Sequence, residues 1–286
     1  MNMWEPTGRL KLKNILFTTD LSLTAEKALP HTLKIAEPYR CTVYALHVIQ
    51  PDVYPLVPPG AWPEMAREAE TFRQDGRANL EQQLQRCPHE IIFRPGKIWP
   101  TISELIEEKQ IDLVVLSTNN RPSVEEAFVG SSAAEIISKA PCPVLVVGPA
   151  AAASPSQNRG LGRILYATDF GTESLAAAPY AVSLAQEHHA QLILLHSIEN
   201  AGDVAAMSDT LRRLVPLGAA LGSEPDCVVE HGAPSDKILE VATGHRADLI
   251  VLGVNGSKRH VQQHLTRSGA LQIVAQAKCP VLIVSS

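Results

Sequence analysis

The sequence lacks several features that would point to a specialised class of protein. It has no apolar run of the ~20 residues that a membrane-spanning helix needs. Its five cysteines are scattered without the CxxC spacing of a zinc cluster, so we expect buried small apolar side chains rather than a metal site or a disulfide framework. The formal net charge of -5 gives no reason to expect nucleic acid or an anionic membrane as a partner. The first residues lack the apolar core of a secretion signal, and the expected location is the cytoplasm.

What the chain does contain is a duplication. With 286 residues, 45% of them hydrophobic and 19% charged, it is long enough for two globular domains that each bury a core. Four segments recur in the same order. They are NILFTTDLS (14–22) with RILYATDFG (163–171), VYALHV (43–48) with LILLHS (192–197), DLVVLS (112–117) with DLIVLG (248–253), and APCPVLVV (140–147) with AKCPVLIV (277–284). We therefore predict domains at 1–148 and 163–286, joined by a linker at 149–162 that is rich in small residues.

The first copy carries an insertion, because its last two matching segments lie farther from the first two than in the second copy. The extra residues fall around 50–76, a segment that is proline-rich and then takes a helical pattern. We expect an ordered loop beside the edge of the sheet. This segment is compatible with two roles, a surface loop that takes no part in binding and a lid over a ligand site.

The pattern within each copy predicts an α/β fold. Short apolar runs alternate with helical patterns, which implies right-handed βαβ crossovers and a doubly wound, parallel, five-stranded sheet in each copy. In such sheets ligands bind beyond the carboxyl ends of the strands. The first copy is predicted to have strands at 14–19, 41–49, 89–94, 111–117 and 143–147, and helices at 22–37, 64–86, 99–109 and 131–139.

The residues that follow the first two strands of each copy are candidate ligands. Asp20 and Asp169 end the first strands, where a carboxylate can accept hydrogen bonds from ribose hydroxyls or a base. Capping of the next helix, helped by Ser22 or Thr172, explains them equally well. His47 and His196, in the second strands, lack a nearby nucleophile motif, so structural hydrogen bonding is favoured over catalysis.

Other histidines suggest a metal site only weakly. His260 and His264 are four residues apart, but neither the Glu of an HExxH motif nor a third ligand accompanies them. His188 and His189 are adjacent. A solvated surface is the favoured account of both pairs, and no metal is assigned.

The most informative pattern follows the fourth strands. The second copy has Gly253-Val-Asn-Gly256, a loop, and Thr266-Arg-Ser268; the first has Ser117-Thr-Asn-Asn120, nine residues, and Gly130-Ser-Ser132. This repeat resembles the universal stress protein domain, whose nucleotide-binding members carry G-x2-G-x9-G-[ST] after this strand. The resemblance extends to Gly96 and Gly232 ahead of the third helix, and to the DLIVLG and CPVLIV strands. It implies a Rossmann-like fold of the adenine nucleotide alpha hydrolase type.

The resemblance also implies a site for ATP or AMP, with or without Mg²⁺. In the second copy Asp169 would meet ribose or adenine, the backbone near Ser197 would border the base, and Gly253, Gly256 and Ser268 would surround the phosphates. The first-copy counterparts are Asp20, Val48, Gly130, Ser131 and Ser132.

Each copy departs from the family pattern. Ser117 and Asn120 replace the first two glycines in the first copy, and Asn tolerates left-handed backbone better than most residues. In the second copy Arg267 stands where Gly130 does, and could either block the turn or supply charge to a phosphate, as could Lys258. We expect the second copy to hold the nucleotide.

Three functions are compatible with these residues. The favoured one is an adenine-nucleotide-binding regulatory protein of the stress response without efficient catalysis. The second is a nucleotide-free scaffold that acts through protein partners, and the third is a slow ATPase. The apolar strands 144–147 and 281–284 lie at sheet edges, and exposed edges favour pairing. By the resemblance, the two copies pair through them with pseudo-two-fold symmetry, and two chains are expected to form a homodimer.

Overall fold

The computed structural model describes residues 10–50, 62–118, 129–152, 160–198, 204–216, 218–254 and 269–285. The strands are β1 (Asn14–Thr18), β2 (Thr42–Ile49), β3 (His89–Pro95), β4 (Leu113–Ser117), β5 (Val144–Val147), β6 (Arg163–Ala167), β7 (Gln191–Ile198), β8 (Asp226–His231), β9 (Leu249–Val254) and β10 (Val281–Ser285). The helices are α1 (Leu23–Glu26), α2 (Leu29–Tyr39), α3 (Trp62–Leu84), α4 (Ile98–Glu108), α5 (Ser131–Lys139), α6 (Pro149–Ala152), α7 (Thr172–Leu175), α8 (Ala178–His188), α9 (Val204–Arg213), α10 (Pro234–Gly244) and α12 (Gly269–Gln276).

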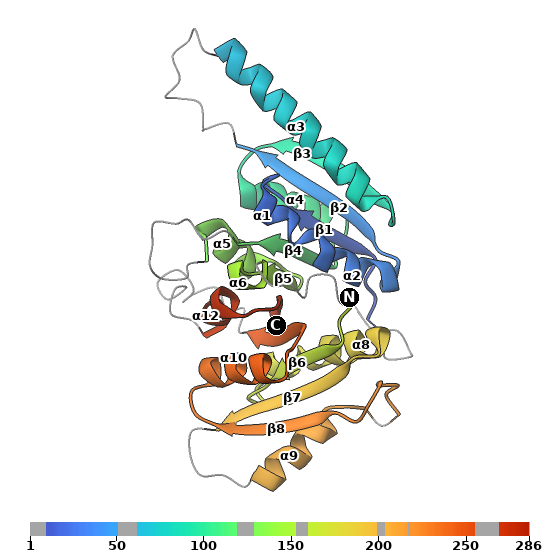
Figure 1. The fold of residues 1–286 in the computed structure, drawn as a ribbon, viewed down its shortest axis with the longest axis vertical. Coiled ribbons are helices and arrows are strands. Elements are labelled where there is room, and N and C mark those ends of the chain that lie inside the picture. Colours follow the sequence, from blue (N-terminus) through green and yellow to red (C-terminus); the bar gives the residue numbers. More distant parts are fainter. Residues whose placement is uncertain are drawn as a thin grey trace.

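The ten strands form one sheet in the order β3-β2-β1-β4-β5-β10-β9-β6-β7-β8 (Figure 1). Within each half the neighbouring strands are parallel. The halves join through β5 and β10, which pair antiparallel with Leu145 opposite Leu282. These leucines hold the same position in the two copies, so a pseudo-two-fold axis runs through this pair. The predicted α/β fold and the pairing of the terminal strands are confirmed, and the pairing merges the two five-stranded sheets into one.

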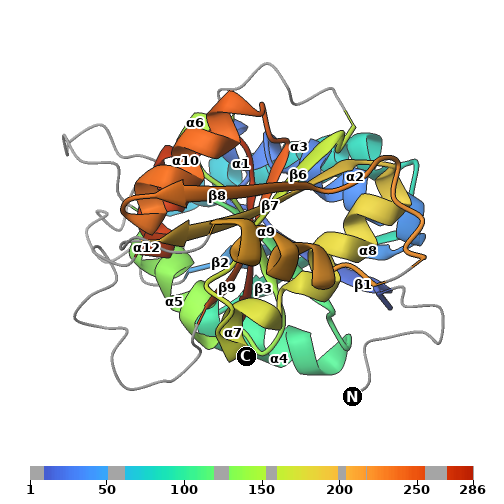
Figure 2. The ribbon, with the colours of Figure 1, turned by 90° about the horizontal axis from the view of Figure 1, so that it is seen from below.

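Helices cover both faces of the sheet, as the view along the molecule shows (Figure 2). Buried side chains of α2, α3, α6, α8 and α9 pack on one face. Those of α4, α5, α10 and α12 pack on the other. Each of these two core layers contains residues from both halves, so the halves share their cores as well as their sheet.

The first predicted helix differs from the structure. The pattern predicts one helix over 22–37, whereas the structure has α1 and α2 with a break between them. Pro30 explains the break, because it lies in the first turn of α2, where its missing N–H costs no hydrogen bond, and it could not continue a helix from α1. The second half repeats the arrangement with Pro179 at the start of α8.

The linker begins as a helical turn, α6, rather than as irregular chain. Ala151 and Ala152 are buried in it. Gly148, just before α6, approaches the other half so closely that a Cβ there would lie 2.0 Å from the carbonyl oxygen of Val274. A glycine at this position therefore lets the start of the linker pack on α12.

The insertion of the first half supplies most of α3, which extends past the β3 edge of the sheet (Figure 1). Its counterpart in the second half is the shorter α9. Residues 51–61 of the insertion lie outside the described residues, and a lid role for it stays a prediction. No helix within the described ranges combines the length and the apolar character that crossing a membrane requires.

Candidate functional site

The carboxyl ends of three strands meet at one edge of the sheet in each half, which we call the carboxyl edge. In the first half β1 lies between β2 and β4. In the second half β6 lies between β7 and β9. The fold therefore gathers the predicted strand-end residues at this edge. They are Asp20, Val48 and Ser117 in the first half and Asp169, Ser197 and Gly253 in the second.

The turn after β1 is held by its own side chains. Asp20 Oδ1 accepts a hydrogen bond from the Ser22 amide at 3.0 Å. Ser22 then caps α1, its hydroxyl accepting from the Ala25 amide at 3.2 Å. Between them Leu21 has a φ of 62°, and its amide donates to Thr19 Oγ1 at 2.9 Å.

The turn after β6 uses a different set of bonds. Asp169 Oδ1 accepts from the Gly171 amide at 2.9 Å and from the Ser174 hydroxyl at 2.6 Å. The Ser174 hydroxyl bond, then that of the Gly171 amide, hold the pKa of Asp169 below its ordinary value. Beneath the turn, the buried Tyr166 hydroxyl donates to the Ser174 carbonyl at 2.7 Å. A carboxylate is thus kept ionised where the chain leaves β6.

These contacts bear on the two explanations of the aspartates. Each carboxylate binds an amide at the entry to the next helix, as the capping explanation requires. Thr172 takes no part as a cap, because α7 starts at Thr172 and Gly171 is its N-cap. Asp20 and Asp169 are nevertheless exposed, so both remain accessible to a ligand.

The two histidines near the ends of the second strands, His47 and His196, make the structural hydrogen bonds that the sequence favours. The Nδ1–H of His47 donates to the Thr19 carbonyl at 3.0 Å, and that of His196 donates to the Thr168 carbonyl at 2.8 Å. Each ring ties its second strand to the turn of the first. The His196 ring also lies 4.5 Å from the ring of Phe170, between centroids.

Ser197 is fixed in the same region of the second half. Its hydroxyl donates to the Gly232 carbonyl at 2.7 Å. Gly232 has a φ of 135°, and Gly96 in the first half has a φ of 152°, which are conformations that favour glycine. The family-like glycines ahead of α4 and α10 therefore have a backbone reason to be there.

Gly253 has a packing role that its place in the motif does not reveal. A Cβ at Gly253 would lie 2.0 Å from the Glu173 carbonyl oxygen and 2.5 Å from Ser174 Cα. The absent side chain lets α7 rest directly on β9. Its first-half counterpart, Ser117, carries a side chain and is partly exposed. Gly253 is thus needed by the fold whether or not a phosphate approaches it.

The helix that follows the fourth strand starts at the same edge. In the first half α5 begins at Ser131 with Gly130 as its N-cap, and no side chain caps it. Its first amides lack helical partners and suit an anion. In the second half α12 begins at Gly269, directly after the predicted cap Ser268. Several predicted residues lie outside the described residues: Asn120, Gly256, Lys258, His260, His264, Thr266, Arg267 and Ser268.

The remaining titratable residues concern the expectations for a metal site and for the paired histidines. Among the described residues, no group of three or more His, Cys, Asp or Glu side chains could hold a metal ion. The prediction of a solvated pair at His188 and His189 holds only for His189, which is exposed. His188 is partly buried, because α8 packs at the junction of the two halves, and its Nε2 is buried without a partner in the described structure.

Comparisons with known proteins agree with this architecture. The model of the universal stress protein family matches residues 11–148 and again 160–285. A universal stress protein of Methanocaldococcus jannaschii is 30% identical over 145 residues, which cover 49% of this chain and 84% of that protein. One of Thermus aquaticus is 35% identical over 133 residues, 42% of this chain and 96% of that protein. The crystal structure of a universal stress protein from Archaeoglobus fulgidus covers 95% of this chain and 96% of its own, with a TM-score of 0.75 and 20% identity.

Proposed function

The chain belongs to the universal stress protein family, with two domains in tandem, and we propose that it binds an adenine nucleotide, ATP or AMP, as a regulatory protein of the stress response. One observation carries the proposal. The carboxyl edge of each half carries an aspartate after its first strand, a serine at the end of a neighbouring strand and the start of a helix. The aspartates are Asp20 and Asp169, the serines are Ser117 and Ser197, and the helices are α5 and α12. Ligands of doubly wound sheets bind at this edge, and helix N-termini suit phosphates.

We place the nucleotide in the second half. Asp169 would accept from ribose hydroxyls, because its lowered pKa keeps it ionised and it is exposed. The backbone beside Ser197 would border the base. Phosphates, with or without Mg²⁺, would lie over Gly253, Gly256 and Ser268, where Arg267 would add charge. Turnover needs a positioned base for water, and His47 and His196 each bind a backbone carbonyl, so we propose binding without efficient catalysis.

The test is calorimetry with ATP and AMP on protein stripped of nucleotide. The unaltered protein is expected to bind at millimolar or tighter affinity. Asp169→Asn should weaken binding about tenfold, since a hydrogen bond to a charged group contributes roughly 1.5–3 kcal/mol. The matched control is Asp20→Asn, which alters the equivalent carboxylate of the first half and should leave this affinity unchanged. Absence of binding in the unaltered protein would remove the proposal, and a loss confined to Asp20→Asn would move the nucleotide to the first half.

A nucleotide-free scaffold is the second candidate, and the turns themselves favour it. Asp20 and Asp169 each bind amides of their own turn, and Gly253 is required by the packing of α7. These residues thus have reasons to be present without any ligand. The same calorimetry separates the two candidates, because a scaffold predicts no heat with either nucleotide.

Association of two chains remains part of the proposal. Pairing of β5 with β10 uses the edges that separate universal stress domains could offer each other, so a homodimer of this chain would need another surface. Light scattering of purified protein measures this directly, with a mass of twice 30.9 kDa expected.

A further inference from the structure

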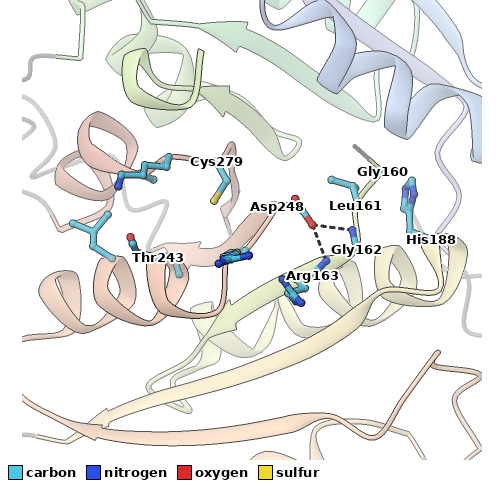
Figure 3. A pocket seen from close by; sticks show the side chains of 14 residues that line it. Gly160, Leu161, Gly162, Arg163, His188, Thr243, Asp248 and Cys279 are labelled. Carbon is cyan, nitrogen blue, oxygen red and sulfur yellow. Dashed lines mark hydrogen bonds between the residues drawn. The ribbon is translucent and has the colours of Figure 1, made fainter. Parts of the chain in front are cut away.

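A pocket lies at the edge of the sheet opposite the candidate nucleotide site. It occupies about 660 Å³ at the starts of β6, β9 and β10, beside the ends of α8 and α10. Figure 3 shows Asp248 between Gly162 and Arg163 on one side and Thr243 and Cys279 on the other. The volume of the pocket is in the range of small-molecule sites, ~300–1,000 Å³.

Among the charged side chains that line the pocket, basic ones predominate. Arg163, Arg246 and Lys278 are exposed around the pocket, and His188 lines it too. The single carboxylate among the lining residues is Asp248, whose Oδ2 already accepts from the amides of Gly162 at 2.9 Å and Arg163 at 3.0 Å. Across the described ranges, no acidic side chain forms a salt bridge with the three basic residues.

The first half provides an internal comparison for this basic character. Repeat equivalence places Asn14 at the position of Arg163, Tyr39 at His188, Gln110 at Arg246 and Pro141 at Lys278. The side-chain amide of Asn14 donates a hydrogen bond to the carbonyl of Lys109, the C-cap of α4, at 2.8 Å. None of the four first-half residues is basic, so the shared fold does not require a basic residue at these positions.

Compensation of helix dipoles does not account for the difference. Basic residues near helix C-termini offset the negative end of the dipole. The first half does this with Lys109 and Lys139, and each also pairs with an acid, Glu90 at 2.9 Å and Glu135 at 2.6 Å. The second-half residues have no such partner among the described residues, so their charge is available to a ligand.

We propose that this pocket binds a small polyanion, a phosphorylated or polycarboxylate metabolite, through Arg163, Arg246, Lys278 and His188. Guanidinium groups hold phosphate and carboxylate oxygens with two parallel hydrogen bonds. The buried Nε2 of His188 would gain the partner that it lacks in the described structure. Burial, and then the charge of Lys34, lower the pKa of His188 and favour its neutral form. A bound anion would raise this pKa again, so its binding would favour protonation of the ring. The site is separate from the nucleotide site, since it lies at the amino ends of the strands.

The experiment is calorimetry with pyrophosphate and, in a second arm, citrate at fixed ionic strength. The variant is Arg163→Asn with Arg246→Gln, which installs the two first-half residues. The matched control is Arg86→Gln with Arg213→Gln, which removes two positive charges from exposed positions elsewhere. We expect millimolar or tighter binding, at least tenfold weaker in the pocket variant and unchanged in the control. Which arm binds tells phosphate from carboxylate.

Absence of binding by the unaltered protein in both arms would overturn the proposal. An equal loss in both double variants would also overturn it, because it would show unspecific attraction to net charge. A second measurement needs no variant: NMR of the histidine side chains should show the His188 nitrogen resonances shifting during the pyrophosphate titration. Unshifted His188 resonances at saturation would contradict the assignment. ATP affinity of the pocket variant is expected to be unchanged, so this result does not depend on the nucleotide proposal.

Discussion

The two halves close the turn after their first strand with different hydrogen bonds, although Leu21 and Phe170 at the same place in the two turns both have a φ of 62°. In the first half Phe17, Ala25 and Ser117 occupy the positions that Tyr166, Ser174 and Gly253 hold in the second. The first turn is fixed by the hydroxyl cap of Ser22 on α1. The second is fixed by the Ser174 hydroxyl on Asp169, with the Tyr166 hydroxyl on the carbonyl below.

The comparison shows that a motif glycine can serve packing in the copy that keeps it. Gly253 permits α7 to lie against β9, and this closeness is what brings Ser174 to Asp169 and Tyr166. The first half has Ser117, Ala25 and Phe17 together, and therefore none of these bonds. The two copies differ at all three positions, and in the second half the glycine, the serine and the tyrosine meet in one contact between α7, β6 and β9.

Exchange of the glycine is expected to have the largest effect. Gly253→Ser places a Cβ 2.0 Å from the Glu173 carbonyl oxygen, and backbone atoms cannot move aside as a flexible side chain would. We expect unfolding in urea to show a loss of about 3 kcal/mol, at the upper end for overpacking. The reverse exchange, Ser117→Gly, should change stability by about 1 kcal/mol or less. Similar losses for the two would mean that the halves pack alike.

The free energy of unfolding should depend on pH through His31, which lies on the first-half side of the junction. His31 in α2 is 5% exposed and neither ring nitrogen has a partner among the described residues. Burial, and then the charge of Lys34, lower the pKa of His31 to about 4. At the equivalent place in α8, Tyr180 has its pKa raised to about 12, by burial first, and stays neutral. Since unfolded His31 binds a proton below its ordinary pKa of 6.5, its contribution is complete above that pH and is lost as the pH falls toward 4.

This contribution should amount to about 2 kcal/mol between pH 7 and pH 5, from 1.36 kcal/mol for each pKa unit. Urea unfolding at the two pH values measures it. His31→Tyr installs the second-half residue and should reduce the difference by that amount, whatever its effect at pH 7. An unchanged difference in this variant would assign the acid sensitivity to other groups, such as His188, whose pKa burial also lowers.

Removal of the serine should make the second turn resemble the first. Ser174→Ala deletes the hydroxyl that donates to Asp169, and we expect a loss of about 1.5 kcal/mol, typical of a hydrogen bond to a charged group. The pKa of Asp169 should rise toward its ordinary value, which NMR titration would show. The control Ala25→Ser adds a hydroxyl to the first half, where Ser22 already caps α1, and should leave the pKa of Asp169 unchanged. A pKa of Asp169 that does not move would show that the Gly171 amide suffices.

Much of the fold follows from local pattern. The apolar runs predict the strands because parallel strands are buried on both faces, and β1, β2 and β4 start and end within two residues of the predicted bounds. The apolar terminal runs indicate edges that favour pairing, while the pairing of β5 with β10 in particular is implied by the family resemblance and is confirmed. The break before α2 has a local signal in Pro30, because proline favours the first turn of a helix over its interior.

The chemistry of the edges follows less well, because it depends on contacts between distant segments. The need for glycine at position 253 arises from α7, and no local signal in the DLIVLG run distinguishes packing from phosphate binding. The burial of His188 depends on the junction of the halves. The rule that ligands bind at the carboxyl ends of strands also draws attention away from the amino ends, where the pocket lies. Arg163 and Arg246 stand out there only when they are compared with their first-half equivalents, Asn14 and Gln110.

Among the exchanges in the second half, the smallest expected effect belongs to a single hydroxyl. Tyr166→Phe installs the first-half residue and removes the donor to the Ser174 carbonyl at 2.7 Å, at a site with 0% exposure. We expect a loss of about 1 kcal/mol in urea unfolding, the usual contribution of a neutral hydrogen bond. The reverse exchange, Phe17→Tyr, should be worse, at about 2 kcal/mol, because it adds a hydroxyl to a fully buried and already packed side chain. If both exchanges were neutral, the difference between the turns would lie in Gly253 alone, and the hydroxyls would follow from the packing without contributing to it.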